Sequence, residues 1–230
     1  MTSGELADAT IVFDLDGTLV DTAPDLMRAL NETLDLEGLP RAKLDTVRAC
    51  VSYGARVLIE RVAARHGVSY SAEKLDALTD AFVAFYRADI AGASRPFPGV
   101  VEAMDALTAL GAKLAVCTNK RTELSVQLLE ALGLAERFSA IIGADAVADR
   151  KPHPDHYRAA VTRAGGVVRR SVMVGDSAAD LAAARGAGAP AVIVAFGYSD
   201  VGAETLGADV LLHRYTELAP ACRRLLAARP

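Results

Sequence analysis

The sequence has no block of basic residues, few cysteines and no long uncharged run, and each absence excludes a class of protein. The formal net charge is −4 at pH 7, so the chain lacks the basic surface that nucleic-acid binding requires. The most extended uncharged stretch, residues 186–199, is interrupted by Gly188, Pro190 and Gly197, and is too short to span a bilayer. We therefore expect neither a nucleic-acid partner nor a membrane partner.

The three cysteines form no close pair and no cluster with metal-ligand spacing. They are Cys50, Cys117 and Cys222, and their odd number and wide spacing favour a reduced compartment. We expect them to be small buried or half-buried apolar residues. The first nine residues contain Glu5 and Asp8 and lack the basic start and apolar run of a signal peptide. These features predict a cytoplasmic protein, and the choice between monomer and homodimer stays open.

Short apolar runs alternate with helical patterns through most of the chain. The predicted strands, rich in β-branched and aliphatic residues, cover 10–13, 113–117, 140–142, 172–174, 191–194 and 210–212. The predicted helices of this part cover 100–110, 121–132, 154–165, 180–187 and 217–228. This alternation predicts an α/β fold, with a Rossmann-like parallel sheet core and helices on both faces.

The segment after the first strand has a different pattern, because no convincing strand occurs in it. Its predicted helices cover 23–36, 41–49, 55–66 and 71–91. Residues 92–99 contain two glycines and two prolines and are predicted to be a linker. We expect an α/β core domain of residues 1–20 and 96–230, with an inserted α-helical cap domain of residues 21–95.

Polar side chains follow four of the predicted strands. They are Asp14 and Asp16, then Thr118 and Asn119, then Lys151, and finally Asp176 with Asp180. In an open parallel sheet, ligands bind beyond the carboxyl ends of the strands. Carboxylates gathered there repel unless a cation lies among them, and a few hard oxygen ligands suit Mg²⁺. Lysine, hydroxyl and amide donors suit phosphate oxygens, so the pattern predicts a site for magnesium and a phosphate.

Spacing within the motifs refines this prediction. Asp14 and Asp16 are two residues apart and point the same way in an extended backbone, so one could attack phosphorus while the other transfers a proton. Asp176 and Asp180 share a helix face, which lets Asp176 reach a metal with Asp180 behind it. Each motif alone could be a turn, a helix cap or a solvated charge. For Lys120 and Arg121, a solvated helix start and a role with an anionic substrate are equally compatible with the sequence.

These motifs resemble those of the haloacid dehalogenase superfamily of phosphohydrolases. The matching segments are Asp14–Asp21 (DLDGTLVD), Thr118–Asn119, Lys151–Pro152, and Gly175–Ser177 with Asp180. Within the superfamily the chain is most similar to the phosphoglycolate phosphatase group, over residues 12–26, 118–120, 151–154 and 174–177. The resemblance implies Mg²⁺-dependent hydrolysis of a small phosphorylated metabolite, with 2-phosphoglycolate as the first candidate.

The resemblance also implies a role for each catalytic residue. Asp14 would attack phosphorus and become an aspartyl phosphate, while Asp16 would protonate the leaving oxygen and then activate water. Thr118 and Lys151 would hold the phosphoryl oxygens. The metal would be bound by the Asp14 side chain, the Asp16 backbone carbonyl and Asp176, with Asp180 behind them.

The remaining predicted contacts concern the substrate. Gly17 and Asn119 are expected beside the phosphate, and Tyr53, Gly54 and Arg56 are the cap residues expected to select the substrate. Arg56 could meet a substrate carboxylate, or it could be an ordinary charge on a helix surface.

Three other hypotheses use the same core. A sugar-phosphate mutase resembling β-phosphoglucomutase and an inorganic pyrophosphatase would share the motifs and differ in the cap. A non-catalytic phosphate-binding module is disfavoured, because Asp14, Asp16, Lys151 and Asp176 are all present.

Overall fold

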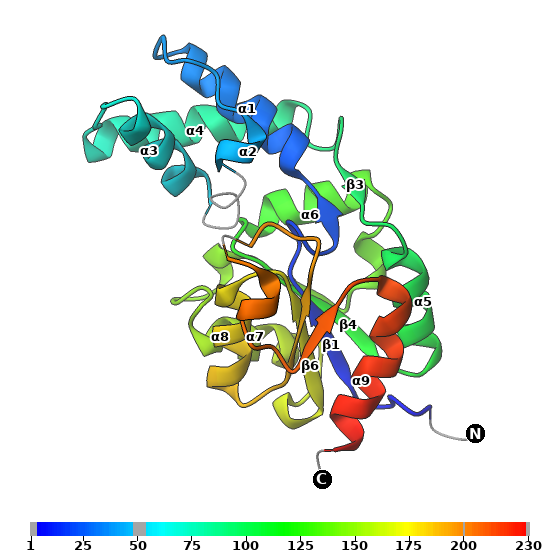
Figure 1. The fold of residues 1–230 in the computed structure, drawn as a ribbon. Helices are drawn as coiled ribbons and strands as arrows, with labels where there is room; N and C mark the ends of the chain where they lie inside the picture. The colour runs from blue at the N-terminus through cyan, green and yellow to red at the C-terminus, as the bar shows by residue number, and fades with distance from the viewer. Residues whose placement is uncertain (1–3, 48–53, 200, 229–230) are drawn as a thin grey trace.

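The computed structural model describes residues 4–47, 54–199 and 201–228, and its centre is a six-stranded parallel sheet (Figure 1). The strand order is β5-β4-β1-β6-β7-β8. The strands are β1 (Thr10–Phe13), β4 (Lys113–Cys117), β5 (Ala140–Ile142), β6 (Ser171–Gly175), β7 (Ala191–Val194) and β8 (Val210–Leu212). Every predicted strand is present, and the predicted α/β fold with a parallel sheet is confirmed.

The central strand β1 is buried on both faces because its side chains alternate between two hydrophobic clusters. Ile11 and Phe13 belong to one cluster, and Val12 belongs to the other. The first cluster contains side chains of α5 (Val100–Ala109), α6 (Thr122–Ala131) and α9 (Leu218–Ala227). The second contains side chains of α7 (Pro154–Arg163) and α8 (Ala178–Ala187). Helices thus cover both faces of the sheet, as a parallel sheet requires.

Four of the helices between β1 and β4 lie together at one end of the molecule, beside the carboxyl end of β1 (Figure 1). We call them the helical insert: α1 (Ala23–Asp35), α2 (Leu44–Val47), α3 (Ala55–Arg65) and α4 (Ala72–Ala88). In α1, Leu26, Leu30 and Leu34 recur every four residues and are buried, and Pro24 occupies the first turn. The side chain of Ser71 caps α4 by accepting a hydrogen bond from the Lys74 backbone N–H.

The helical insert has a hydrophobic cluster that also reaches the rest of the chain. Most of its members lie on α1, α3 and α4, but Leu124 of α6 and Tyr198 after β7 belong to the same cluster. The sequence predicted longer helices than the structure contains. For example, α4 ends at Ala88 rather than residue 91, and Gly92 follows shortly after it.

A short two-stranded antiparallel sheet lies where the chain enters and leaves the helical insert. It pairs β2 (Val20–Asp21) with β3 (Arg95–Pro96). The prediction that residues 92–99 are only a linker was wrong for Arg95 and Pro96. Strands of two residues carry no periodic pattern, and Pro96 disfavours a strand in a sequence-based prediction.

The structure also bears on the cysteines and on membrane spanning. Cys117 and Cys222 are buried free thiols, and burial raises the pKa of each to about 12, so both are inert apolar side chains. Cys50 lies outside the described residues. Among the helices of the described ranges, none combines the length and the apolar character that crossing a bilayer demands.

Candidate active site

The site forms at the carboxyl ends of three neighbouring strands. Asp14 follows β1, Thr118 follows β4 and Asp176 follows β6, and β1 pairs with both of the other strands. The Asp14 backbone N–H donates to the Val174 carbonyl at 2.9 Å, so the loop after β1 continues the ladder with β6. A cavity of about 410 Å³ lies above Asp14 and Thr118, between the sheet and the helical insert.

Lys151 lies between two carboxylates. Its Nζ is 2.9 Å from Asp14 Oδ1 and 2.7 Å from Asp180 Oδ1, and it also donates to the Cys117 carbonyl at 2.7 Å. Burial opposes the charge of Lys151, but the two carboxylates outweigh it and raise its pKa above the usual range. The ammonium is therefore a fixed positive charge beside Asp14.

Asp14 is itself buried, and burial opposes its ionisation. Burial raises its pKa to about 7; Asp180 and Asp16 act in the same direction, and Lys151 opposes them. One backbone donor, the Leu15 N–H, reaches Asp14 Oδ1 at 2.7 Å.

Three carboxylates meet where the sequence predicts a metal. One oxygen each of Asp14, Asp176 and Asp180 lies within 4.8 Å of the other two. Asp176 Oδ2 accepts a 2.6 Å hydrogen bond from the Tyr198 backbone N–H, whereas Asp176 Oδ1 is buried and has no partner in the described part of the chain. Burial and the nearby Asp180 raise the pKa of Asp176 well above its usual range.

This donor set fits a divalent cation such as Mg²⁺. Asp176 Oδ1 is a buried carboxylate oxygen without a partner in the described part of the chain, and it lies next to the Asp14 carboxylate. A hard cation bound between the two would offset their repulsion and give this oxygen a partner. Both oxygens of Asp180 are engaged, because Oδ1 accepts from Lys151 and Oδ2 accepts from Ser177 Oγ at 2.6 Å. Asp14 and Asp176 are thus the better ligands, and Asp180 lies behind them.

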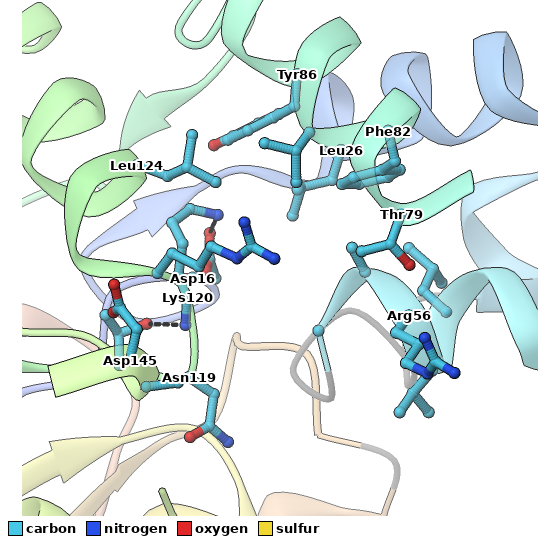
Figure 2. A pocket seen from close by; sticks show the side chains of 18 of the residues that line it. Asp16, Leu26, Arg56, Thr79, Phe82, Tyr86, Asn119, Lys120, Leu124 and Asp145 are labelled. Carbon is cyan, nitrogen blue, oxygen red and sulfur yellow. Dashed lines mark hydrogen bonds and ion pairs between the residues drawn. The ribbon is translucent and has the colours of Figure 1, made fainter. Parts of the chain in front are cut away.

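The side chain of Asp16 is directed by two donors. Its Oδ1 accepts a 2.6 Å hydrogen bond from Thr22 Oγ1 and a 3.0 Å bond from Lys120 Nζ (Figure 2). Burial opposes the charge of Lys120, but Asp16 outweighs it and raises the pKa of Lys120 above the usual range. The sequence left the position of Lys120 open; the structure places it in the cavity wall, with its side chain 7 % exposed.

Gly17 allows the close approach of two site residues. Its φ is +82°, and an ideal Cβ there would lie 2.4 Å from Asp176 Oδ2 and 2.8 Å from Tyr198 Cδ2. Gly17 is therefore needed for the packing around Asp176, in addition to any contact with substrate.

Tyr198 is a residue that sequence reasoning missed, because the polar motifs follow other strands and residues 195–197 after β7 carry no polar side chain. Besides the bond to Asp176, its hydroxyl donates to Asp21 of β2 and accepts from the Ala23 N–H at 2.9 Å. It connects the loop after β7 to the start of the helical insert. An aromatic residue directly after a glycine at a strand end was the available signal.

The other predicted substrate contacts are distributed around the cavity. Asn119 Nδ2 donates to the Lys151 carbonyl at 3.1 Å, so this amide holds the Lys151 loop. Gly54 is the N-cap residue of α3 and lines the cavity, and Arg56 lines it while forming an ion pair with Asp76 of α4. Tyr53 lies outside the described residues.

Comparison with known proteins identifies the family. A family model of haloacid dehalogenase-like hydrolases matches residues 9–188, and the chain belongs to this family. A protein of Caulobacter vibrioides named phosphoglycolate phosphatase is 51 % identical over 226 residues, covering 98 % of this chain and 95 % of that protein. The predicted resemblance and the predicted enzyme class, a phosphoric monoester hydrolase, are confirmed.

Solved structures agree with this assignment. A predicted phosphoglycolate phosphatase from Haemophilus somnus superposes with a TM-score of 0.87 at 29 % identity, covering 94 % of this chain and 98 % of that one. CbbY from Rhodobacter sphaeroides, in complex with phosphate, superposes with a TM-score of 0.78 at 29 % identity, covering 94 % and 99 %.

Proposed function

We propose that this phosphatase is Mg²⁺-dependent and hydrolyses a small phosphomonoester, with 2-phosphoglycolate as the first candidate, through an aspartyl phosphate on Asp14. The observation that carries the proposal is the position of Asp14 in the cavity wall, with Lys151 Nζ at 2.9 Å from it and Asp176 beside it. The name of the Caulobacter relative supports the choice of substrate.

The reaction proceeds in two displacements. In the first, an Asp14 carboxylate oxygen attacks phosphorus, the bond to the ester oxygen breaks, and Asp16 gives its proton to the departing oxygen. In the second, Asp16 takes a proton from water while the water oxygen attacks phosphorus. The bond to Asp14 breaks, which releases inorganic phosphate and restores the Asp14 carboxylate and the protonated Asp16.

The charges around Asp14 suit a transferring phosphoryl group. Lys151 supplies a permanent positive charge, and the Thr118 hydroxyl lies in the wall of the same cavity. Mg²⁺, held by the carboxylates of Asp14 and Asp176 and by the Asp16 carbonyl, would neutralise phosphoryl oxygens during the transfer. Asp180 keeps Lys151 and the Asp176 backbone N–H in place, since it accepts from both.

The helical insert indicates that the substrate is small. In our proposal residues 21–95 form a cap that closes over the site and excludes bulk water. Leu26, Phe82 and Tyr86 of the helical insert line the cavity together with Asp14. A cavity of about 410 Å³ fits a short phosphate ester and excludes a folded protein substrate.

The test is a panel of phosphate esters assayed for phosphate release with and without Mg²⁺. It includes 2-phosphoglycolate, pyrophosphate and a hexose phosphate. We expect 2-phosphoglycolate to have the highest kcat/KM, with no turnover after chelation. Faster phosphate release from pyrophosphate would show that the protein is a pyrophosphatase. Isomerised sugar in excess of free phosphate would show that it is a mutase.

A variant of the nucleophile tests the covalent step. Asp14→Asn should lose turnover while still binding inorganic phosphate in the presence of Mg²⁺, measured by calorimetry. Unchanged turnover in Asp14→Asn would remove the aspartyl phosphate from the mechanism.

A further inference from the structure

We propose that Lys120 and Tyr86 together form the subsite for the second anionic group of the substrate, which is a carboxylate in 2-phosphoglycolate. The inference rests on the proposed function and deepens it, because it assigns the part of the site that selects among phosphate esters. One residue comes from the core, directly after β4, and the other from α4 of the helical insert.

Substrate geometry places the carboxylate beside Asp16. In 2-phosphoglycolate one methylene group separates the carboxylate from the ester oxygen. The group that protonates this oxygen must therefore lie next to the carboxylate subsite. In the proposed mechanism that group is Asp16, and Lys120 Nζ is the cation that contacts it, at 3.0 Å. A lysine ammonium has three donors, so bonding to Asp16 does not exhaust it.

Tyr86 supplies a hydrogen-bond donor at the same place. Lys120 Nζ lies 4.6 Å from the centre of the Tyr86 ring, and Figure 2 shows the ammonium between Asp16 and this ring. Tyr86 is 1 % exposed, and its hydroxyl donates to no residue among those described. The adjacent Lys120 ammonium can donate to this hydroxyl but cannot accept from it, so the hydroxyl proton indicates an acceptor on a ligand. Burial raises the pKa of Tyr86 to about 12, which keeps the hydroxyl protonated.

The surroundings strengthen the preference for an anion. Leu26, Phe82 and Leu124 line the cavity near Tyr86, and apolar walls strengthen an ion pair by excluding water (Figure 2). The other cations of the cavity wall are less suitable. The side chain of Arg56 is paired with Asp76 and is 41 % exposed, and Arg121 and Arg150 are also exposed side chains.

The experiment compares 2-phosphoglycolate with ethyl phosphate, which has the same two-carbon length and no carboxylate. In Lys120→Met, we expect kcat/KM for 2-phosphoglycolate to fall about 10- to 100-fold further than kcat/KM for ethyl phosphate, because a charge-assisted hydrogen bond is lost. In Tyr86→Phe, which removes one oxygen atom, the selective loss should be about 5- to 10-fold. Circular dichroism and thermal unfolding check that both variants fold.

Matched controls keep the result interpretable. Lys113→Met and Tyr70→Phe change the same residue types away from the cavity; Lys113 donates to the Gly165 carbonyl near the opposite end of β4. Each of these two control variants should leave kcat/KM unchanged for 2-phosphoglycolate and for ethyl phosphate. Arg121→Gln and Arg150→Gln test the exposed arginines, and a selective loss in these two but not in Lys120→Met or Tyr86→Phe would overturn the proposal.

Two further outcomes separate this inference from the proposed function. An equal loss for both substrates in Lys120→Met, with no selective loss in Tyr86→Phe, means that Lys120 only positions Asp16, and the subsite is wrong while the phosphatase stands. Wild-type protein that hydrolyses ethyl phosphate as well as 2-phosphoglycolate likewise contradicts the subsite alone. Wild-type protein that releases phosphate from neither ester removes the proposed substrate and the subsite together.

Discussion

Asp25 and Ser94 hold together the two places where the chain passes between the sheet and the helical insert. The Asp25 carboxylate accepts hydrogen bonds from Ser94 Oγ at 2.6 Å and from the Ser94 backbone N–H at 2.7 Å, and both residues are buried. The same carboxylate also accepts from the Ala93 N–H. These bonds lie next to the paired strands, since β2 ends at Asp21 and β3 begins at Arg95.

Removing this carboxylate should destabilise the protein. Asp25→Ala leaves three donors without a partner, and we expect the free energy of unfolding to fall by about 3 kcal/mol. Ser94→Ala removes one donor and should cost about 1 kcal/mol. Urea denaturation measures both changes, with Asp80→Ala, an exposed carboxylate of α4, as the control. If Asp25→Ala unfolds at the same urea concentration as Asp80→Ala, the bonds do not stabilise the junction.

Gly17 allows a prediction with a closely matched control. Gly17→Ala introduces a Cβ against Asp176 Oδ2 and the Tyr198 ring, so we expect Mg²⁺ affinity to fall at least about tenfold and the protein to lose stability. Gly38→Ala has a similar positive φ, +63°, but nothing lies within 4 Å of its ideal Cβ. The Gly38→Ala variant therefore has the strain of an alanine at positive φ but no steric clash of its Cβ.

Calorimetry with Mg²⁺ separates the two effects. Gly38→Ala should bind the metal like wild-type protein, since its substitution lies away from Asp176. Equal Mg²⁺ affinity in Gly17→Ala and Gly38→Ala would show that the contact with Asp176 has no influence on the metal.

Strand ends were predictable because parallel strands are short, apolar and followed by turns. Residues 10–13 and 113–117 coincide with β1 and β4, and Asp14 and Thr118, which follow these strands, line the same cavity. Two rules can be applied to short segments of the sequence: side chains of a strand alternate between its faces, and ligands bind beyond the carboxyl ends of parallel strands. The approach of Asp14 and Asp176 follows from those two rules, whereas Lys151 comes from a loop well beyond the end of β5.

Contacts between distant segments were not predictable. The backbone N–H of Tyr198 binds Asp176, and the ring of Tyr86 faces Lys120, although neither pair has any spacing that a sequence pattern could reveal. The first contact depends on the course of the loop after β7, and the second on how the helical insert packs against the sheet. Arg56 is an instructive case, because its charge suggested a substrate contact, and the Asp76 that pairs with it is 20 residues away on another helix.

The ion pair of Lys151 with Asp180 supports a third prediction. Asp180→Asn keeps the size of the side chain but leaves the buried ammonium with one carboxylate fewer, and we expect stability to fall by about 3 kcal/mol. We also expect kcat to fall at least about tenfold, because Lys151 is then drawn toward Asp14. Ser177→Ala, which removes one donor to Asp180 and a helix cap, should cost about 1 kcal/mol and retain most activity. Wild-type kcat in Asp180→Asn would contradict a positioning role for Asp180.

His156 supports a prediction about pH. It is fully buried; its Nδ1 accepts from the Lys151 N–H and its Nε2–H donates to the Ile142 carbonyl, each at 3.1 Å, so the folded protein holds the neutral imidazole. Burial, with help from the Lys151 charge, lowers the pKa of His156 to about 4. In the unfolded chain the pKa is about 6.5.

The sign of the effect follows from where the proton binds. Between pH 6.5 and 4 the unfolded chain takes up a proton at His156 and the folded protein does not, so stability falls as the pH falls. This loss in the free energy of unfolding reaches about 3 kcal/mol at pH 4 and is absent above pH 6.5. His156→Gln should therefore be less stable than wild type at pH 7, yet lose less stability on acidification. Urea denaturation at pH 7, 6, 5 and 4.5 measures this slope, with the exposed His66→Gln as the control. Parallel stability curves for wild type and His156→Gln would show that His156 does not link folding to pH.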